Sequence, residues 1–122
     1  MKSERISILD KFEQLPPNDY AVGIIAKMNN YEFKIVKFKG DFVWHSHSDT
    51  DEAFIIIEGT MVMSFRGRTV EVRAGEMIIV PKGVEHKPSS TGGYKALLIE
   101  PEGVPNTGNV QSDMTITKVE WV

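Results

Sequence analysis

The sequence predicts an all-β protein, folded as a sandwich or barrel, and two observations indicate this class. From Tyr20 onward, short runs of β-branched and aromatic residues are interrupted by Gly or Pro about every eight to twelve residues. Two of these runs, 55–57 and 77–80, are apolar at consecutive positions, so we expect both of their faces to be covered. A chain of 122 residues fits one domain spanning 1–122.

Composition narrows the partners and the compartment. An apolar fraction of 41%, a charged fraction of 25% and a net charge of -3 are ordinary for a globular protein and give no reason to expect nucleic acid. The chain has no cysteine, which excludes disulfides and thiolate metal sites. Residues 1–12 carry scattered charges and no long apolar run, so we expect a cytoplasmic protein with no membrane partner. A small molecule is then the expected ligand.

The first elements are a helix and a hairpin. Ile6, Leu9 and Phe12 are spaced by three before Pro16 and Pro17, which predicts a short amphipathic helix over 6–15. Two strands then follow, with a turn at 29–30 between them. Further strands are predicted at 42–47, 52–58, 60–65, 69–74, 76–80 and 94–100, with a last one in the tail 115–122 and a turn-rich rim loop from 100 to 113.

The strands that are apolar on both faces also bear on assembly. A second sheet covers one face of such a strand, and a partner subunit or a flanking segment of the chain must cover the other. We therefore expect a homodimer.

Two of the three histidines of the chain lie two residues apart, at His45 and His47. Side chains two apart on a strand point to the same face, about 6.5 Å apart at the backbone, so both imidazoles can reach one ion. A carboxylate from Asp49, Asp51 or Glu52 follows, but a turn resets the alternation and spacing leaves the choice open.

The third histidine completes a possible metal site. His86 follows Pro81, which ends a buried strand, and Gly83, which allows a sharp bend back toward the first pair. Metal binding by all three histidines is the hypothesis that this pattern favours. The alternative is two exposed strand residues and a loop histidine with ordinary hydrogen bonds.

These residues resemble the two motifs of the cupin superfamily. The first motif, at 40–59, matches at Gly40, His45, His47, Glu52 and Gly59, and the second, at 75–90, matches at Gly75, Pro81, Gly83 and His86. The short separation of the motifs is similar to that of small single-domain microbial cupins. The resemblance implies a jelly-roll β-barrel, with the short helix before it, and a metal bound by His45, His47, Glu52 and His86.

The chain departs from the cupin pattern at two points. Four residues rather than five separate Gly40 from His45, which alters how the chain enters the site. The Asn that usually closes the second motif is Ser90, and we expect this change to loosen a loop after His86. Neither departure removes a ligand.

The donor set indicates the type of metal and of function. Three imidazoles and a carboxylate suit a divalent transition metal such as Fe, Mn, Ni, Co or Zn. By resemblance to cupins, a metal-dependent enzyme acting on a small organic molecule follows, either a dioxygenase or an isomerase. The alternative is a non-catalytic module that binds or senses a metal or a small ligand, and a purely structural ion is a third possibility.

Other side chains are weaker candidates. A minority of a set of apolar strand residues is expected to line the barrel mouth: Phe33, Ile35, Val43, Phe54, Ile56, Met61, Met63 and Leu98. Trp44 is expected to pack outward or at a subunit contact. Asp49, Asp51 and Glu85 are candidate bases or partners of the ligands, although a solvated loop carboxylate is the commoner case. We interpret 105–108 as a crossing loop rather than a lid.

Overall fold

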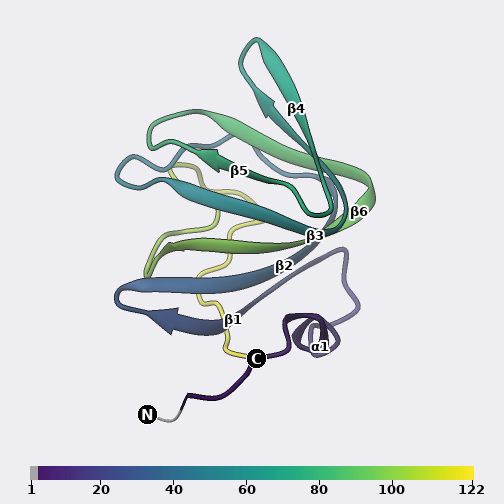
Figure 1. The fold of residues 1–122 in the computed structure, drawn as a ribbon. Helices are drawn as coiled ribbons and strands as arrows, with labels where there is room; N and C mark the ends of the chain where they lie inside the picture. The colour runs from purple at the N-terminus through teal and green to yellow at the C-terminus, as the bar shows by residue number, and fades with distance from the viewer. Residues whose placement is uncertain (1–2) are drawn as a thin grey trace.

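The fold is one curved antiparallel sheet with a single short helix outside it (Figure 1). The computed structural model describes residues 3–122. Its elements are α1 (Ile8–Phe12), β1 (Tyr20–Met28), β2 (Tyr31–Asp41), β3 (Glu52–Phe65), β4 (Arg68–Arg73), β5 (Met77–Val80) and β6 (His86–Pro101). The strand order is β1-β2-β6-β3-β4, with β5 paired to the start of β3. This arrangement confirms the all-β, jelly-roll prediction.

The two longest strands, β3 and β6, bend together where two glycines meet. Gly59 has a φ of +79°, and a Cβ atom there would lie 2.2 Å from the Gly93 carbonyl oxygen. The prediction that a strand ends at Gly59 is wrong, because the chain continues through it as part of β3. Irregular pairing around Gly59 changes the alternation, so that Ile56 before it and Met61 after it both face the core.

The bent sheet buries one apolar cluster on each face. The inner cluster fills the barrel and includes Phe38, Phe54, Met61 and Met63. The outer cluster lies between the sheet and α1 and consists of Phe12, Leu15, Ala21, Ile25, Ile35 and Leu97, with partly buried neighbours packed against it. Each central strand contributes alternate residues to the two clusters, as strand geometry requires.

The helix is shorter than predicted and uses a different face. It covers five residues because Ser7 caps its start, accepting a hydrogen bond from the Asp10 backbone N–H at 3.3 Å. Ile8, Phe12 and Leu15 pack on the sheet, whereas Leu9 is 63% exposed. The outer cluster therefore follows an i, i+4, i+7 spacing rather than the predicted spacing of three.

Two predicted strands are only single bridges. Residues 42–47 pair with β6 at His45 and His86, and the tail pairs with β1 at Ile24 and Trp121. The 42–47 segment does not continue as a ladder because the Ser46 backbone instead bonds Asn109, outside the sheet. Extended backbone is present in both places, but the ladder is not.

Coverage of the apolar strands is uneven. Ile55 and Ile57 pack against the outer cluster under α1, so a flanking segment covers β3 there. Met77 and Ile79 on β5 are 54% and 55% exposed.

Among the helices described in residues 3–122, none is long and apolar enough to cross a membrane.

Candidate metal centre

His45 and His86 are held opposite each other by the main chain. The His45 N–H donates to the His86 carbonyl at 3.0 Å, and the His86 N–H donates to the His45 carbonyl at 2.9 Å. In an antiparallel bridge, opposite residues point to the same face. The two imidazole rings consequently lie 4.2 Å apart, centroid to centroid, inside the barrel.

His47 and Glu52 join this pair from the segment that leads into β3. The His47 carbonyl accepts a hydrogen bond from the Gly83 N–H at 2.8 Å, so the bend at Gly83 positions one histidine as well as leading to another. Glu52 is the first residue of β3. The same-face prediction for His45 and His47 is confirmed, since both belong to one buried cluster.

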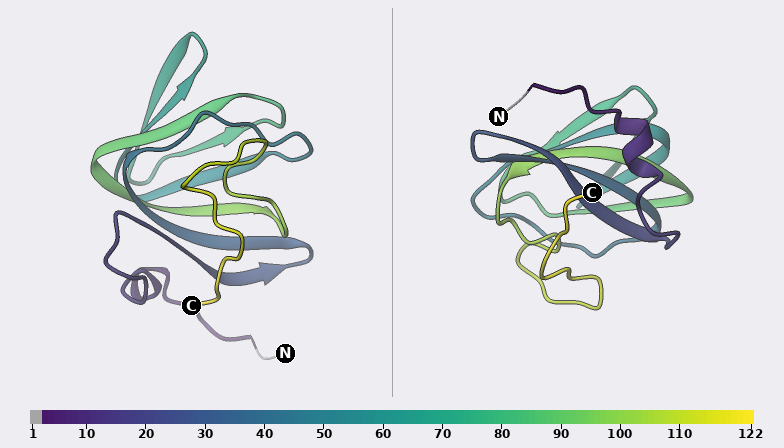
Figure 2. Two further views of the ribbon diagram at one scale, coloured as in Figure 1. Left: turned by 180° about the vertical axis from the view of Figure 1, so that it is seen from behind. Right: turned by 90° about the horizontal axis from the view of Figure 1, so that it is seen from below.

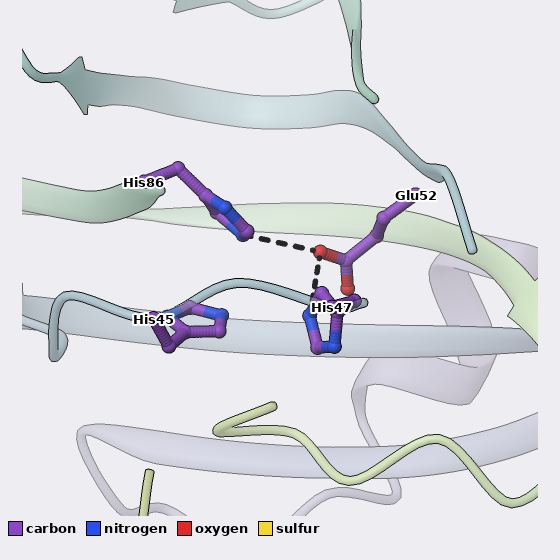
Figure 3. Close-up of side chains that lie close together, drawn as sticks. All are labelled: His45, His47, Glu52 and His86. Atoms are coloured by element: carbon purple, nitrogen blue, oxygen red, sulfur yellow. Dashed lines mark ion pairs between the residues drawn. The ribbon is translucent and has the colours of Figure 1, made fainter. Parts of the chain in front are cut away.

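The four side chains converge on one point (Figure 3). Glu52 Oε1 lies 3.3 Å from His47 Nε2 and 3.5 Å from His86 Nε2. One ligand atom from each of His45, His47, Glu52 and His86 lies within 4.8 Å of the others. All four residues are buried, with 0–5% of their surface exposed.

The backbone fixes which ring nitrogen faces the cluster. A carbonyl oxygen can only accept, so His45 Nδ1–H donates to Val43 O at 2.8 Å and His86 Nδ1–H donates to Val84 O at 2.9 Å. In a neutral imidazole the Nε2 atom then carries a free lone pair. Such outer hydrogen bonds are the usual way to orient metal-binding histidines.

Several polar atoms at this point lack a partner within residues 3–122. Both ring nitrogens of His47, the Nε2 atom of His86 and Oε1 of Glu52 are buried and make no hydrogen bond in the described chain. Buried polar atoms are rarely left unpaired, because each costs about 1–3 kcal/mol. A shared cation would satisfy three of the four.

The spacing of these atoms fits such a cation. Nitrogen and oxygen ligands bind first-row transition metals at about 2.0–2.2 Å, so neighbouring ligands around one ion lie about 3 Å or more apart. The Glu52 to His47 and Glu52 to His86 distances are of this size. The residues present therefore fit a divalent transition metal.

The surroundings of the cluster favour the protonation states that metal binding needs at His45 and Glu52. Burial, together with the neighbouring His86, lowers the pKa of His45 to about 4, so this imidazole is neutral at neutral pH. Burial by itself raises the pKa of the Glu52 carboxyl, but the adjacent His47 and His86 rings outweigh it and hold this pKa below its usual range. Glu52 is consequently ionised when His45 is neutral.

A narrow cavity of about 50 Å³ opens beside His45 and Glu52. Its walls are mostly apolar and aromatic. The residues that line it are Tyr20, Val22, Lys34, Val36, Phe38, Phe42, His45, Glu52, Phe54, Tyr94, Leu98, Glu100, Asn106 and Val119.

Sequence reasoning did not identify the polar residues of this cavity. Lys34 Nζ bonds Glu100 Oε1 at 2.9 Å and lies 3.6 Å from Glu32 Oε1. Burial and the nearby Glu52 charge raise the pKa of Glu100 to about 8, against the effect of the Lys34 ammonium. A signal was available, because Lys34 lies two residues before Val36 and Glu100 two after Leu98, so each shares a face with an inward apolar residue.

Other sequence candidates lie away from the cluster. Asp49 is exposed, and Asp51 accepts a hydrogen bond from the Lys82 N–H at 2.9 Å. Glu85 is exposed and pairs with Arg66, which stacks 3.9 Å from the Trp44 ring on the outside of the barrel. Trp44 therefore packs outward, as predicted.

The apolar candidates divide between the two faces. Phe33 and Ile35 do not line the mouth, because both belong to the outer cluster under α1. Phe54 and Leu98 line the cavity, and the other candidates belong to the inner cluster or pack against it.

Ser90 is not in a loop. It lies within β6, where its hydroxyl donates to the Thr60 carbonyl at 2.6 Å and accepts from the Gly93 N–H at 2.9 Å. The expectation of a loosened loop after His86 is wrong, since the strand begins at that residue.

Comparison with known proteins agrees with this geometry. The family model described as Cupin_2, cupin domain, matches residues 34–100, which include all four clustered residues. The crystal structure of a cupin-2 domain containing protein from Shewanella frigidimarina is 47% identical, with a TM-score of 0.77, over 80% of this chain and 94% of that one.

Two curated proteins are also similar over part of the chain. The uncharacterized protein YdbB of Bacillus subtilis is 33% identical over 54% of this chain and 59% of its own length. A 3-hydroxyanthranilate 3,4-dioxygenase of Xanthomonas euvesicatoria is 33% identical over 51% of this chain and 38% of its own length. The chain thus spans less than two thirds of both curated relatives. The family match over more than half of the chain and the 47% identical structure show that this protein belongs to the cupin-2 family of small β-barrel proteins.

Proposed function

We propose that His45, His47, Glu52 and His86 bind a divalent transition metal, and that the protein is a metal-dependent enzyme acting on a small organic molecule. The observation that carries the proposal is the convergence of four buried ligand atoms within 4.8 Å, three of them without another partner in residues 3–122. Four protein ligands leave positions open on an ion that accepts six. A metal held there supplies Lewis-acid chemistry or an activated bound water.

The chain's own residues prepare the site for this chemistry. The Val43 and Val84 carbonyls hold the protons of His45 and His86 on Nδ1, which keeps the Nε2 atoms free to bind. Glu52 supplies the only carboxylate of the cluster, and its ionised form offsets one positive charge of the ion. Apolar side chains around the cavity exclude water from the bound substrate.

The reaction class is supported by analogy. The relative named 3-hydroxyanthranilate 3,4-dioxygenase is similar to this chain over 38% of its own length, which makes dioxygenation one candidate. Isomerisation through an enol is the other, because the same open positions can bind both oxygens of a hydroxycarbonyl compound. A phosphosugar is disfavoured, since Lys34, the one lysine or arginine among the described residues that line the cavity, already contacts Glu100 and Glu32.

A non-catalytic sensing or binding module is the second candidate. It is favoured by the cavity lining described in residues 3–122, in which both carboxyl groups are engaged, Glu52 in the metal cluster and Glu100 with Lys34. Such a module would bind a metal and a small ligand without turnover.

Reconstitution separates the two candidates. Metal-free protein is loaded anaerobically with Fe(II), Mn, Ni, Co or Zn, and each form is assayed for oxygen uptake and for turnover of a panel of hydroxycarbonyl and aromatic diol compounds. We expect at least one form to turn over a substrate. Stoichiometric metal binding with no turnover in any form would favour the sensing module, and no metal binding would refute both.

We also propose that the protein forms a homodimer through β5. Met77 and Ile79 are large, apolar and more than half exposed, and β5 pairs with β3 alone among the described strands. Sedimentation velocity should give a dimer for the wild type and a monomer for Ile79→Lys. A monomeric wild type would refute this assignment.

A further inference from the structure

The segment after β6 crosses the barrel on the side of the metal cluster (Figure 2, yellow). We call residues 102–119 the strap. Asn106 and Val119 of the strap line the cavity beside His45 and Glu52. The family match ends at residue 100, so the strap lies outside the part of the chain that defines the family.

The strap is anchored at both ends to the first hairpin. At its start, the Glu102 N–H donates to the Asn30 carbonyl at 2.8 Å, and the Glu102 carboxylate pairs with Lys27. Just beyond its end, the Ile24 N–H donates to the Glu120 carbonyl at 2.9 Å. Any movement of the strap is therefore confined to the part between these anchors.

The middle of the strap is braced internally. Asn106 bonds the Met114 carbonyl at 2.7 Å and the Ile116 N–H at 2.8 Å. The Thr107 hydroxyl is buried and bonds Val110 O and Thr115 Oγ1 at 2.8 and 2.7 Å. These bonds make the middle of the strap a unit that can shift as one piece.

The braced unit touches the metal cluster at one place. Asn109 exchanges two hydrogen bonds with Ser46, from Ser46 N to Asn109 Oδ1 at 2.9 Å and from Asn109 N to Ser46 O at 3.1 Å. Gly108 packs so closely that a Cβ atom there would lie 2.1 Å from Ser46 O and 3.2 Å from His47 Nδ1. The strap therefore lies directly against Ser46 and His47, and His47 is a proposed metal ligand.

Surface hollows lie on both sides of this place. A surface hollow of about 320 Å³ follows the seam between strap residues 103–109 and the loop 46–50. Another, of about 410 Å³, follows the other edge, from Ile24 and Lys34 to Val119. Hollows along both edges leave the Ser46 to Asn109 pair and the Asn106 bond to Tyr20 Oη as the polar links that hold the middle of the strap to the barrel.

We infer that the strap is the specificity element of this site and restricts its ligands to very small molecules that carry an oxygen donor. A cavity of about 50 Å³ holds roughly three to five water-sized groups. Its lining combines the proposed ligands His45 and Glu52, the Asn106 side chain and the Lys34–Glu100 pair with a larger set of apolar and aromatic residues. Larger ligands require the strap to open at Gly108 and Asn109.

The chemistry of the ligand in this inference rests on the proposed function. The closure of the cavity by the strap is independent of it. Two measurements separate them. The first uses a pair of probes with the same metal-binding group, acetohydroxamate and benzohydroxamate, which differ only by methyl and phenyl. The second uses diethyl pyrocarbonate, which modifies accessible neutral imidazoles and needs no metal.

Three variants complete the design. Gly108→Ala introduces the clash with Ser46, whereas Gly103→Ala is its matched control, because Gly103 also has a positive φ (+80°) but nothing lies within 4 Å of its Cβ position. Both alanines carry the cost of a left-handed backbone, so this cost cancels in the comparison. Asn109→Ala removes one bond to Ser46 and serves if Gly108→Ala does not fold.

The hydroxamates are titrated into Co(II)-loaded protein and followed by the cobalt visible spectrum. In the wild type and in Gly103→Ala, we expect acetohydroxamate to bind at least about tenfold more tightly than benzohydroxamate. In Gly108→Ala or Asn109→Ala, the preference should fall toward equality. Equal or tighter binding of benzohydroxamate to the wild type would overturn the size limit.

Carbethoxylation tests the strap without metal. Peptide mass spectrometry should show that His45 and His47 are modified at least about fivefold faster in Gly108→Ala or Asn109→Ala than in the wild type and Gly103→Ala. This factor corresponds to a loss of about 1 kcal/mol in the free energy that keeps the strap closed. Equal rates in all four proteins would refute the strap as a cover. Cobalt that fails to bind would refute the proposed metal site, and the modification rates would still decide whether the strap covers the cavity.

Discussion

The two faces of the same sheet differ in what they bury. The outer face packs apolar side chains against α1, and the buried polar residues described in 3–122 all lie outside the α1-facing strand positions 21, 25, 35 and 97. The inner face buries His45, His47, Glu52, His86, Lys34 and Glu100 together with its apolar cluster. Burying a polar or charged group costs free energy unless it is fully paired. The difference indicates that the outer face supplies stability, whereas the inner face gives up stability for a binding site.

The largest expected effect lies on the outer face. Ile35→Ala removes a fully buried side chain and leaves a cavity under α1, so we expect a loss of about 2–5 kcal/mol in the free energy of unfolding. Metal binding per folded molecule should stay at the wild-type level, because no ligand contacts this cluster. Urea unfolding and elemental analysis measure the two quantities. A folded Ile35→Ala protein without metal would break the division between the faces.

On the inner face, removal of a ligand should affect binding rather than folding. His47→Ala and His86→Ala are each expected to weaken metal binding by more than about 100-fold, since even outer partners of ligands contribute 10–100-fold. Circular dichroism should show a folded barrel. Glu85→Gln is the control, because Glu85 is adjacent to His86 in sequence but exposed. Wild-type metal content in both histidine variants would contradict the assignment.

Metal should restore stability to the inner face. An ion that binds only the native state contributes about 2.7 kcal/mol at a hundredfold excess over Kd, or roughly 10 °C in Tm for a chain of this size. Calorimetry with and without metal measures the shift. The shift should vanish in His47→Ala and persist in Ile35→Ala; the opposite pattern would place the ion elsewhere.

The smallest effect, over any one pH unit, is a pH dependence of the metal-free protein. The pKa of His45 is about 4 in the native state and about 6.5 when unfolded, so between these values the unfolded chain binds more protons. Stability from neutral His45 is complete above about pH 6.5 and falls by up to about 1.4 kcal/mol per pH unit as the pH drops toward 4. His45→Asn should lack this component in urea unfolding at several pH values. Parallel curves for the two proteins would show that His45 titrates normally.

The sequence predicted the strands and the clustering of the four candidate side chains more accurately than the boundaries of the elements. Turn residues at 29–30 and the spacing of His45 and His47 are local signals, and both predictions held. The continuity of β3 through Gly59 could not be predicted, because it depends on the approach of Gly93, far away in sequence.

The polar wall of the cavity was missed for a related reason. Lys34 and Glu100 lie 66 residues apart, and each alone resembles an ordinary surface charge. Their pairing follows from the register of β2 against β6, which places residue 34 opposite 98 and residue 32 opposite 100. Register is a property of the assembled sheet, and the sequence of one strand does not specify it.

The reciprocal backbone bonds between His45 and His86 have one more consequence. The separation of these two imidazoles is determined by peptide groups, so substitutions at the neighbouring positions 44 and 85, whose side chains point outward, leave it unchanged. The exterior of the barrel at positions 44 and 85 can therefore change, for new contacts or new solubility, while the distance between the two rings inside is kept.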